Sequence, residues 1–391
     1  MEDLTAARLE YDAIRGQMIA LQEELDWDVY RRYGLITAEE AADLIANPKT
    51  VPELSLGERA FEIVLARRLQ EEGLHTEWFN RFGGKQTIEM PTHWSAAYTA
   101  VVARRIEIIE RNRNIGLIER PECKRRWQSE PWEDKEQAAL TIWLLDRCEE
   151  RSLWFNADGE PVPMTVNRLA DRLRTDADVV SVARLLRGQD ADLGDVLKEV
   201  IAEEHVPFLA QYRYKPSGMD KRRQWERTWD LQREEDATGR KLDIDVPPKY
   251  AGADFQKQSY WRHRGKLDVP KERFISYPDA SPDSDPKSLL IGWAGWDHRE
   301  QPAALITLIQ ERSDVDGWET PKLMGLLAGL LEVMPWVRQW HGEVNPDFGM
   351  SYADAYDGYL TAQRESRSLT EDDLRNWTPA PSARGGRKRK G

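Results

Sequence analysis

The sequence predicts a mainly α-helical protein that has many helices and few short strands. Apolar residues recur at spacings of three and four in many segments, as in helices that bury one face. Alternating runs of Val, Ile and Thr, which are typical of strands, rarely exceed a few residues. With 40% hydrophobic and 32% charged residues, the chain fits a soluble, folded protein. We therefore expect two packed helical subdomains and an irregular, proline-punctuated basic segment.

The first subdomain is expected over residues 1–130. It begins with a long helix that resembles an arm packed against another part of this chain or an upstream domain. The apolar residues of that helix lie at spacings of three, four and seven: Leu4, Tyr11, Ile14, Met18, Leu21 and Leu25. Thr37 and Glu40 form a capping box that opens a short helix. Further helices are predicted over residues 56–73 and 94–113.

The second domain is expected over residues 131–376. Asp158-Gly159, with Pro161 close by, predicts a loop after the first helix of this domain. Residues 239–286 contain many prolines and are expected to be irregular, and residues 289–296 are either a short strand or the lead into a helix. Thr370 caps the last helix, and residues 377–391 form a disordered basic tail. The predicted helices cover residues 133–151, 166–174, 178–187, 192–204, 221–233, 302–312 and 320–340.

The bulk properties exclude several classes of protein. The formal net charge of −13 argues against a protein that coats nucleic acid over its whole surface. The two cysteines, Cys123 and Cys148, lie far apart, which favours a reduced, cytoplasmic setting. No signal peptide is recognised, and the longest apolar segment, around residues 323–337, is too short to span a bilayer. We expect no contact with a membrane.

The sequence offers no catalytic site and no metal site. It has no Gly-rich phosphate loop and no Gly-x-Ser-x-Gly turn, and its six histidines are scattered. DNA amino-methyltransferases need an Asn/Asp-Pro-Pro-aromatic loop for the flipped base. The nearest match, Asn345-Pro346-Asp347-Phe348, lacks the second proline and is interpreted as a turn.

One segment, residues 255–277, has the pattern of a nucleic-acid contact. Basic residues alternate there with Phe255, Tyr260, Trp261, Phe274 and Tyr277. Cations beside stacking rings are typical of nucleic-acid surfaces, although a solvated loop anchored by its aromatic residues has the same pattern. A basic helix around residues 221–233 extends the candidate surface. The candidate DNA-binding residues are Lys257, Tyr260, Trp261, Arg262, Arg264, Lys266, Lys271, Arg273, Lys221, Arg222 and Arg223.

Three long runs resemble the C-terminal region of the PglX family. They are residues 154–171 (Trp154-Phe-Asn-Ala-Asp-Gly-Glu-Pro), 224–233 (Gln224-Trp-Glu-Arg-Thr-Trp) and 260–277 (Tyr260-Trp-Arg-His-Arg-Gly). This family comprises the adenine-specific DNA methyltransferases of BREX type 2, or phage growth limitation, systems, and the likeness covers essentially the whole chain. Residues 25–35 resemble the end of the target-recognition region of large DNA methyltransferases.

The resemblance implies a non-catalytic, C-terminal part of a methyltransferase that acts in phage defence. The full-length family uses S-adenosylmethionine to methylate adenine at N6, with machinery that lies outside this chain, so no cofactor is expected here. The partners implied are DNA, the upstream catalytic part and other BREX proteins. One alternative is a protein-interaction scaffold that does not bind DNA. Another is a magnesium-dependent nuclease that uses Asp243, Asp245 and Asp254.

Overall fold

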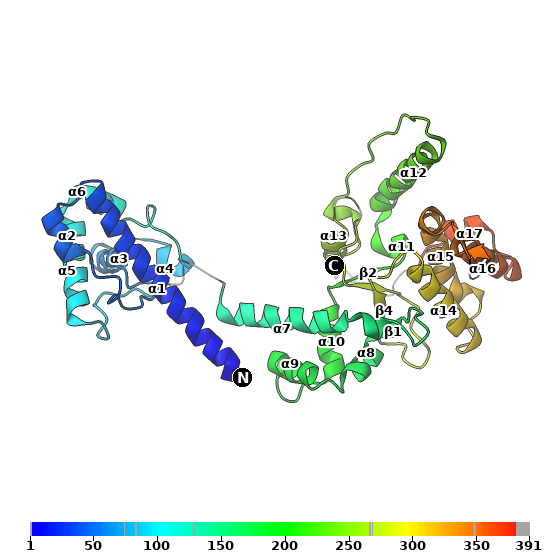
Figure 1. The fold of residues 1–391 in the computed structure, drawn as a ribbon, viewed down its shortest axis with the longest axis horizontal. Helices are drawn as coiled ribbons and strands as arrows, with labels where there is room; N and C mark the ends of the chain where they lie inside the picture. The colour runs from blue at the N-terminus through cyan, green and yellow to red at the C-terminus, as the bar shows by residue number, and fades with distance from the viewer. Residues whose placement is uncertain are drawn as a thin grey trace, which may run out of the picture. The chain divides into compact units, whose positions relative to one another are not determined.

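The computed structural model describes residues 2–73, 75–82, 84–127, 130–265, 267, 269–346 and 349–380. The chain is mainly helical with a few strands of two to four residues, which confirms the predicted fold class (Figure 1). It divides into two compact units, residues 1–136 and 137–391, and each is described by itself. Within the described residues, no helix is long and apolar enough to cross a membrane.

The described residues of unit 1 form six helices and the start of a seventh. Thr37 forms the predicted capping box with Glu40, because the short side chain and the carboxylate bond each other's backbone N–H groups. Ser95 caps the fifth helix in a similar way, through the N–H of Tyr98. The helices are α1 (Glu2–Arg32), α2 (Ala38–Leu44), α3 (Ala60–Glu72), α4 (Trp78–Phe82), α5 (Ala96–Arg111), α6 (Arg113–Ile118) and α7 (Trp132–Cys148).

The helix α1 packs on unit 1 with a face other than its apolar stripe. Ile19, Ala20 and Trp27 are buried, and they lie on the same face as Glu23. The predicted stripe of Ile14, Met18, Leu21 and Leu25 instead remains exposed within unit 1 (41–54% of each residue). Periodicity detected the helix correctly, but the inward face carries both apolar residues and acidic residues whose partners are distant in the sequence.

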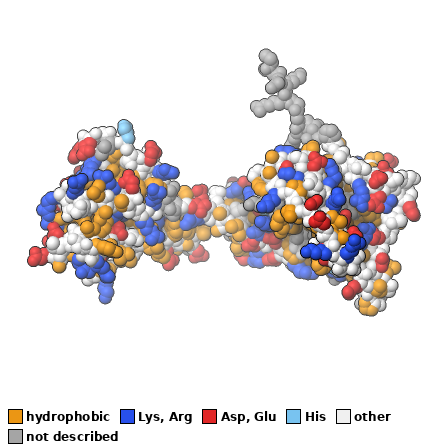
Figure 2. Space-filling view, turned by 90° about the horizontal axis from the view of Figure 1, so that it is seen from above, with side chains coloured by type: hydrophobic (Ala, Val, Ile, Leu, Met, Phe, Trp, Pro, Cys, Tyr) orange, Lys and Arg blue, Asp and Glu red, His pale blue; other side chains and the backbone are white. Residues whose placement is uncertain are grey.

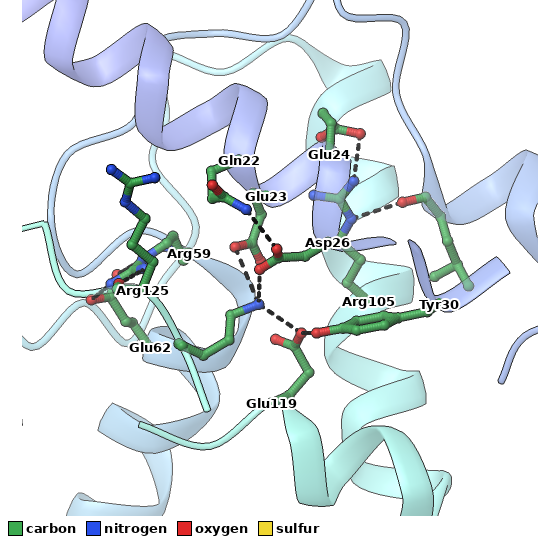
Figure 3. A network of polar contacts seen from close by, with 12 residues as sticks. Gln22, Glu23, Glu24, Asp26, Tyr30, Arg59, Glu62, Arg105, Glu119 and Arg125 are labelled. Atoms are coloured by element: carbon green, nitrogen blue, oxygen red, sulfur yellow. Dashed lines mark hydrogen bonds and ion pairs between the residues drawn. The ribbon is translucent and has the colours of Figure 1, made fainter. Parts of the chain in front are cut away.

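A network of buried charges joins α1 to the rest of unit 1 (Figure 3). Lys124 donates hydrogen bonds of 2.8 Å to both Asp26 and Glu119, and its ammonium lies 3.6 Å from Glu23. Tyr30 donates to Glu119 at 2.6 Å. Burial opposes the charged ammonium of Lys124, but Glu23 and Glu119 outweigh burial and hold its pKa well above the ordinary value.

Arg105 forms a second buried centre in this network. Its guanidinium donates to the carboxylate of Glu24 at 2.7 Å and to the carbonyl of Leu44, at the end of α2, at 2.8 Å. Glu24 also accepts the N–H of Ala46 at 2.7 Å. Arg105 is fully buried, so one side chain of α5 ties together α1 and the end of α2.

Unit 2 begins within α7 and is organised around α15 (Thr320–Trp340), which has the predicted bounds. Figure 1 shows α14 to α17 gathered in one cluster. Trp377, which the sequence assigned to the tail, packs against Tyr212 at 5.7 Å between ring centroids. Residues 381–391 of the predicted tail lie outside the described residues. The other helices are η1 (Arg151–Trp154), α8 (Val166–Leu173), α9 (Ala177–Arg187), α10 (Leu193–Ile201), α11 (Ala210–Arg213), α12 (Pro216–Thr238), η2 (Gly252–Asp254), α13 (Gln258–Arg264), α14 (Glu300–Asp314), α16 (Tyr352–Ser366) and α17 (Glu371–Arg375).

A small mixed sheet lies in the core of unit 2. Its strand order is β1-β4-β3-β2, with β2 parallel to β3 and the other pairs antiparallel. The ambiguous stretch at residues 289–296 forms a strand, and the stretch predicted to be irregular contains η2, α13 and β3. These short strands are stabilised by pairing with strands that are distant in the sequence. Local sequence patterns do not reveal such pairing. The strands are β1 (Met164–Thr165), β2 (His205–Pro207), β3 (Phe274–Ser276) and β4 (Leu290–Trp293), with a separate hairpin of β5 (Val344–Asn345) and β6 (Met350–Ser351).

Candidate nucleic-acid interface

The aromatic residues of segment 255–277 are mostly buried in unit 2. Phe255 packs against Tyr214 and Tyr250, with ring centroids 4.8 and 5.7 Å away. Tyr260 is also buried, and burial raises the pKa of its phenol to about 12. Trp261 alone among the predicted stacking residues is half-buried, beside Phe255. These rings anchor the segment, and they do not form a row of exposed faces for bases.

The basic residues of the segment fall into two groups. Arg264 pairs with Glu272 at 2.5 Å, and Arg273 pairs with Asp146 at 2.6 Å and with Glu149. Burial works against the charged guanidinium of Arg273, but these two carboxylates raise its pKa. Both arginines are therefore engaged within the fold.

Lys257, Arg262 and Lys271 form the exposed group of the segment. Arg262 is held in place by a 3.0 Å hydrogen bond to the carbonyl of Glu203, while 56% of its side chain stays exposed. The ammonium of Lys257 lies 5.3 Å from the ring of Tyr260. Lys266 lies outside the described residues.

The three predicted cations of α12 have different environments. Lys221 donates to Asp254 at 2.6 Å, which fixes α12 to η2 just before the basic segment. Arg222 is buried and bonds Glu226 at 3.0 Å. Arg223 is exposed and pairs with Asp220 one turn away. The structure thus brings α12 next to the basic segment, with Arg222 pointing inward.

A cavity of about 390 Å³ lies where α12, α15 and the end of the basic segment meet. Its charges are arranged in pairs: Arg213 bonds Glu332 at 2.9 Å, and Arg264 bonds Glu272. The aromatic lining residues are Phe208, Trp229, Tyr277, His298 and Trp336. The flat apolar faces of this cavity suit a planar ring, whereas its arginines are already paired with carboxylates.

A row of half-buried rings forms one wall of this cavity. Trp229 on α12 meets Trp336 on α15 edge to face, with centroids 5.2 Å apart. His298 stacks on Trp336 at 5.7 Å, and burial lowers the pKa of this histidine, which favours its neutral form. The guanidinium groups of Arg222 and Arg233 lie 4.7 and 4.5 Å from the centroids of Trp229 and Trp336.

Sequence reasoning assigned none of Trp229, Trp336 and His298 to a site. No local pattern connects residue 229 with residue 336, because the two lie on different helices. The structure thus adds a group of rings and guanidinium groups at α12 and α15 that the sequence did not predict.

One face of the molecule shows the mixed charge of its surface. On the face shown in Figure 2, Lys and Arg side chains are interspersed with Asp and Glu over both units. The carboxylates considered for a nuclease do not converge, because Asp243 and Asp245 are exposed and Asp254 bonds Lys221. Within the described residues, no group of three or more His, Cys, Asp or Glu is placed to hold a metal ion.

Comparison with known proteins gives one strong relative. The chain is 47% identical, over 391 aligned positions, to the adenine-specific methyltransferase PglX of Streptomyces coelicolor. The match covers 97% of the chain and 31% of that larger protein, in its C-terminal region, so the chain spans about a third of its relative. No solved structure matches the chain. Residues 18–389 match the family described as a domain of unknown function, DUF7008, and the chain belongs to that family.

Proposed function

We propose that this chain is the non-catalytic, C-terminal part of a PglX-type adenine-specific DNA methyltransferase and contributes DNA contact in phage defence. The observation that carries the proposal is the cavity between α12 and α15, where rings and guanidinium groups meet. Lys257, Arg262 and Lys271 lie exposed on the segment that runs into this site. Phosphates meet such cations, and bases stack on such rings.

In this proposal, binding of S-adenosylmethionine and methyl transfer take place in the catalytic part of the methyltransferase, outside this chain. The sequence lacks the Asn-Pro-Pro-aromatic loop that holds the flipped adenine, so no residue here is assigned a catalytic role. The chain supplies affinity for DNA and holds the catalytic part near its substrate. DNA and the upstream catalytic part are therefore its proposed partners.

The first test measures duplex binding of the whole chain over a range of salt concentrations. Replacing Lys257, Arg262 and Lys271 together by Ala removes three exposed cations; it also removes the hydrogen bond of Arg262 to Glu203 and its 3.7 Å ion pair with Glu204. Each phosphate contact contributes about 0.9 to the salt slope, so we expect the slope to fall by about 2 to 3.

The matched control replaces three exposed cations elsewhere in unit 2, Arg168, Arg184 and Lys198. This control changes net charge equally and should leave the slope close to that of the parent chain. Equal weakening by both triple variants would mean that only net charge matters. No retention of DNA at low salt would overturn the proposal.

The second test examines the aromatic wall with single-stranded DNA. Trp336→Leu removes the ring between Trp229 and His298. Loss of one stacked base costs about 1–3 kcal/mol, so affinity should fall by about tenfold while the salt slope stays unchanged. Trp340→Leu is the control, because Trp340 is on the same helix and 61% exposed. Equal effects of the two substitutions would show that the aromatic wall is not part of the proposed interface.

A second candidate function is assembly of a defence complex with other BREX proteins. The exposed apolar stripe of α1 favours it, because a long amphipathic face outside the core is a typical interaction surface. Pull-down of the whole chain with and without the stripe substitution Met18→Glu tests this candidate. Unchanged capture of every BREX component would contradict it.

A further inference from the structure

The helix α1 has two opposite apolar faces, and only one of them packs on unit 1. The inner face contains Ile19 and Trp27, whose exposed fractions are 1% and 0%. The outer face contains Ile14, Met18, Leu21 and Leu25, with exposed fractions of 53%, 48%, 41% and 54%. An apolar stripe of this kind on a folded unit indicates an interaction surface.

The outer stripe repeats every seven residues, as in a coiled coil. Leu4, Tyr11, Met18 and Leu25 occupy one position of the heptad, and Ala7, Ile14 and Leu21 occupy the other apolar position. The next position of the repeat is Asp28, which is charged. The row of apolar residues, called the seam below, therefore ends at Leu25. The repeat therefore covers the length of α1 that a short two-stranded coil needs.

The charges beside the stripe are complementary to those of an identical, parallel helix. Asp3 and Glu10 occupy one flank of the seam, and Arg8 and Arg15 occupy the other. In a parallel pair, a residue on the first flank faces the residue five positions later on the partner helix. Glu10 then meets Arg15 of the second copy, at the start of the open part of the stripe. An antiparallel pair centred on Ile14–Leu25 would place Arg15 beside Gln22 of the second copy and would lack this ion pair.

Unit 1 by itself leaves the later part of the stripe open to such a pair. The inner face of α1 lies on the side opposite the stripe, so the remainder of unit 1 in each copy would point away from the seam. The start of α7 covers the first part of the stripe, where Trp132 lies 5.5 Å from Tyr11 and Glu133 pairs with Arg8 at 2.8 Å. The open seam therefore extends from Ile14 to Leu25.

We propose that α1 forms a parallel, two-stranded coiled coil with α1 of a second copy of this chain. Because α1 is already folded against unit 1, association does not have to order the helix, which lowers the entropic cost of binding. About two open heptads make a small contact, so the dimer is concentration-dependent. The inference is independent of DNA contact by unit 2.

The first experiment measures the molar mass of the whole chain by sedimentation over a range of concentrations. We expect the mass to rise from 45.3 kDa towards twice that value. Met18→Glu should keep the chain monomeric, whereas Leu9→Glu should not, because Leu9 is 67% exposed on the same helix but lies outside the seam. A monomer at every concentration would overturn the proposal.

The second experiment tests the direction of the helices. Arg15→Glu places two carboxylates opposite each other and should weaken the dimer, and adding Glu10→Arg should restore it. In a Cys123→Ser background, which leaves only the buried Cys148, Leu25→Cys at the end of the open seam should form an intermolecular disulfide. In an antiparallel pair, Leu25 would face Ile14 of the second copy, and the two introduced thiols would lie at opposite ends of the seam.

Two results would assign the stripe differently. Dimerisation that resists both Met18→Glu and Arg15→Glu would place the interface elsewhere on the chain. A monomer that binds the upstream methyltransferase part, and loses that binding on Met18→Glu, would make that part the occupant. Either result overturns the self-association of α1, and neither bears on salt-dependent DNA binding.

Discussion

Replacing Arg105 by Met should destabilise unit 1 strongly, because it leaves a buried carboxylate without its cation. Arg105 lies 2.7 Å from Glu24, and both side chains are at most 5% exposed. Removing one partner of a buried pair costs about 3–5 kcal/mol. Methionine occupies most of the space of the aliphatic part of the arginine side chain. A cavity should therefore add little to the loss of stability. We expect a loss of about 3–5 kcal/mol in the free energy of unfolding.

The assay is urea unfolding followed by Trp fluorescence, with hydrogen exchange of the α5 amides to locate the loss in unit 1. Burial already raises the pKa of Glu24, against the opposing effect of Arg105. Without Arg105 this pKa rises further, and the charge penalty should shrink as the pH falls and Glu24 becomes protonated. The destabilisation by Arg105→Met should therefore be smaller at acidic pH than at neutral pH.

A double-mutant cycle separates the charge pair from simple loss of packing. Glu24→Gln keeps an acceptor for the N–H of Ala46, which bonds Glu24 at 2.7 Å, but removes the negative charge. The double variant should be less destabilised than the sum of the single variants, by about 2 kcal/mol. Strict additivity, or a loss below about 1 kcal/mol in Arg105→Met, would refute the reasoning.

Three further predictions concern unit 2 and the cysteines. Burial lowers the pKa of His205 from 6.5 to about 4. The folded state therefore loses about 3 kcal/mol of stability relative to the unfolded state as the pH falls from 6.5 to 4, because only the unfolded chain protonates this histidine readily. His205→Gln should flatten the pH dependence of the free energy of unfolding in this range. Gly329→Ala should lower the free energy of unfolding by about 1–3 kcal/mol, because its Cβ would lie 2.1 Å from Phe208. Gly358→Ala has open space within α16 and should stabilise the chain slightly. Equal shifts in the melting temperatures of the two variants would contradict this. A thiol reagent at pH 8 should modify the exposed Cys123 in the native chain, whereas Cys148, whose pKa burial raises to about 12, should react only after unfolding.

The sequence predicted those elements whose signals are local. The capping boxes at Thr37 and Thr370 start helices as expected, since cap and partner are three residues apart. The helix at 320–340 has its predicted bounds, because apolar side chains and an initial Thr-Pro pair define it within one segment. Secondary structure of this kind can be predicted without knowing the tertiary contacts.

The features that sequence reasoning missed depend on distant contacts. Periodicity located α1 but did not show which face packs inward, because that face includes Glu24, whose partner Arg105 lies 81 residues away. The wall of Trp229 and Trp336 likewise joins two helices that no pattern connects. The proposed DNA-contact residues on segment 255–277 remain a prediction, with Lys257, Arg262 and Lys271 as its exposed members.

The parallel pairing of β2 with β3 has a consequence for how this family can diversify. The chain leaves the sheet after Pro207 and returns at Phe274 on the neighbouring strand, so the two ends of the intervening excursion lie about 8 Å apart. This excursion has a small core of its own, which includes Tyr214, Tyr250 and Phe255. The segment between the two strands therefore resembles an inserted subdomain. Insertions, deletions or replacement of this whole segment need not disturb β2 and β3. Changes in this excursion can therefore leave the pairing of β2 with β3 intact.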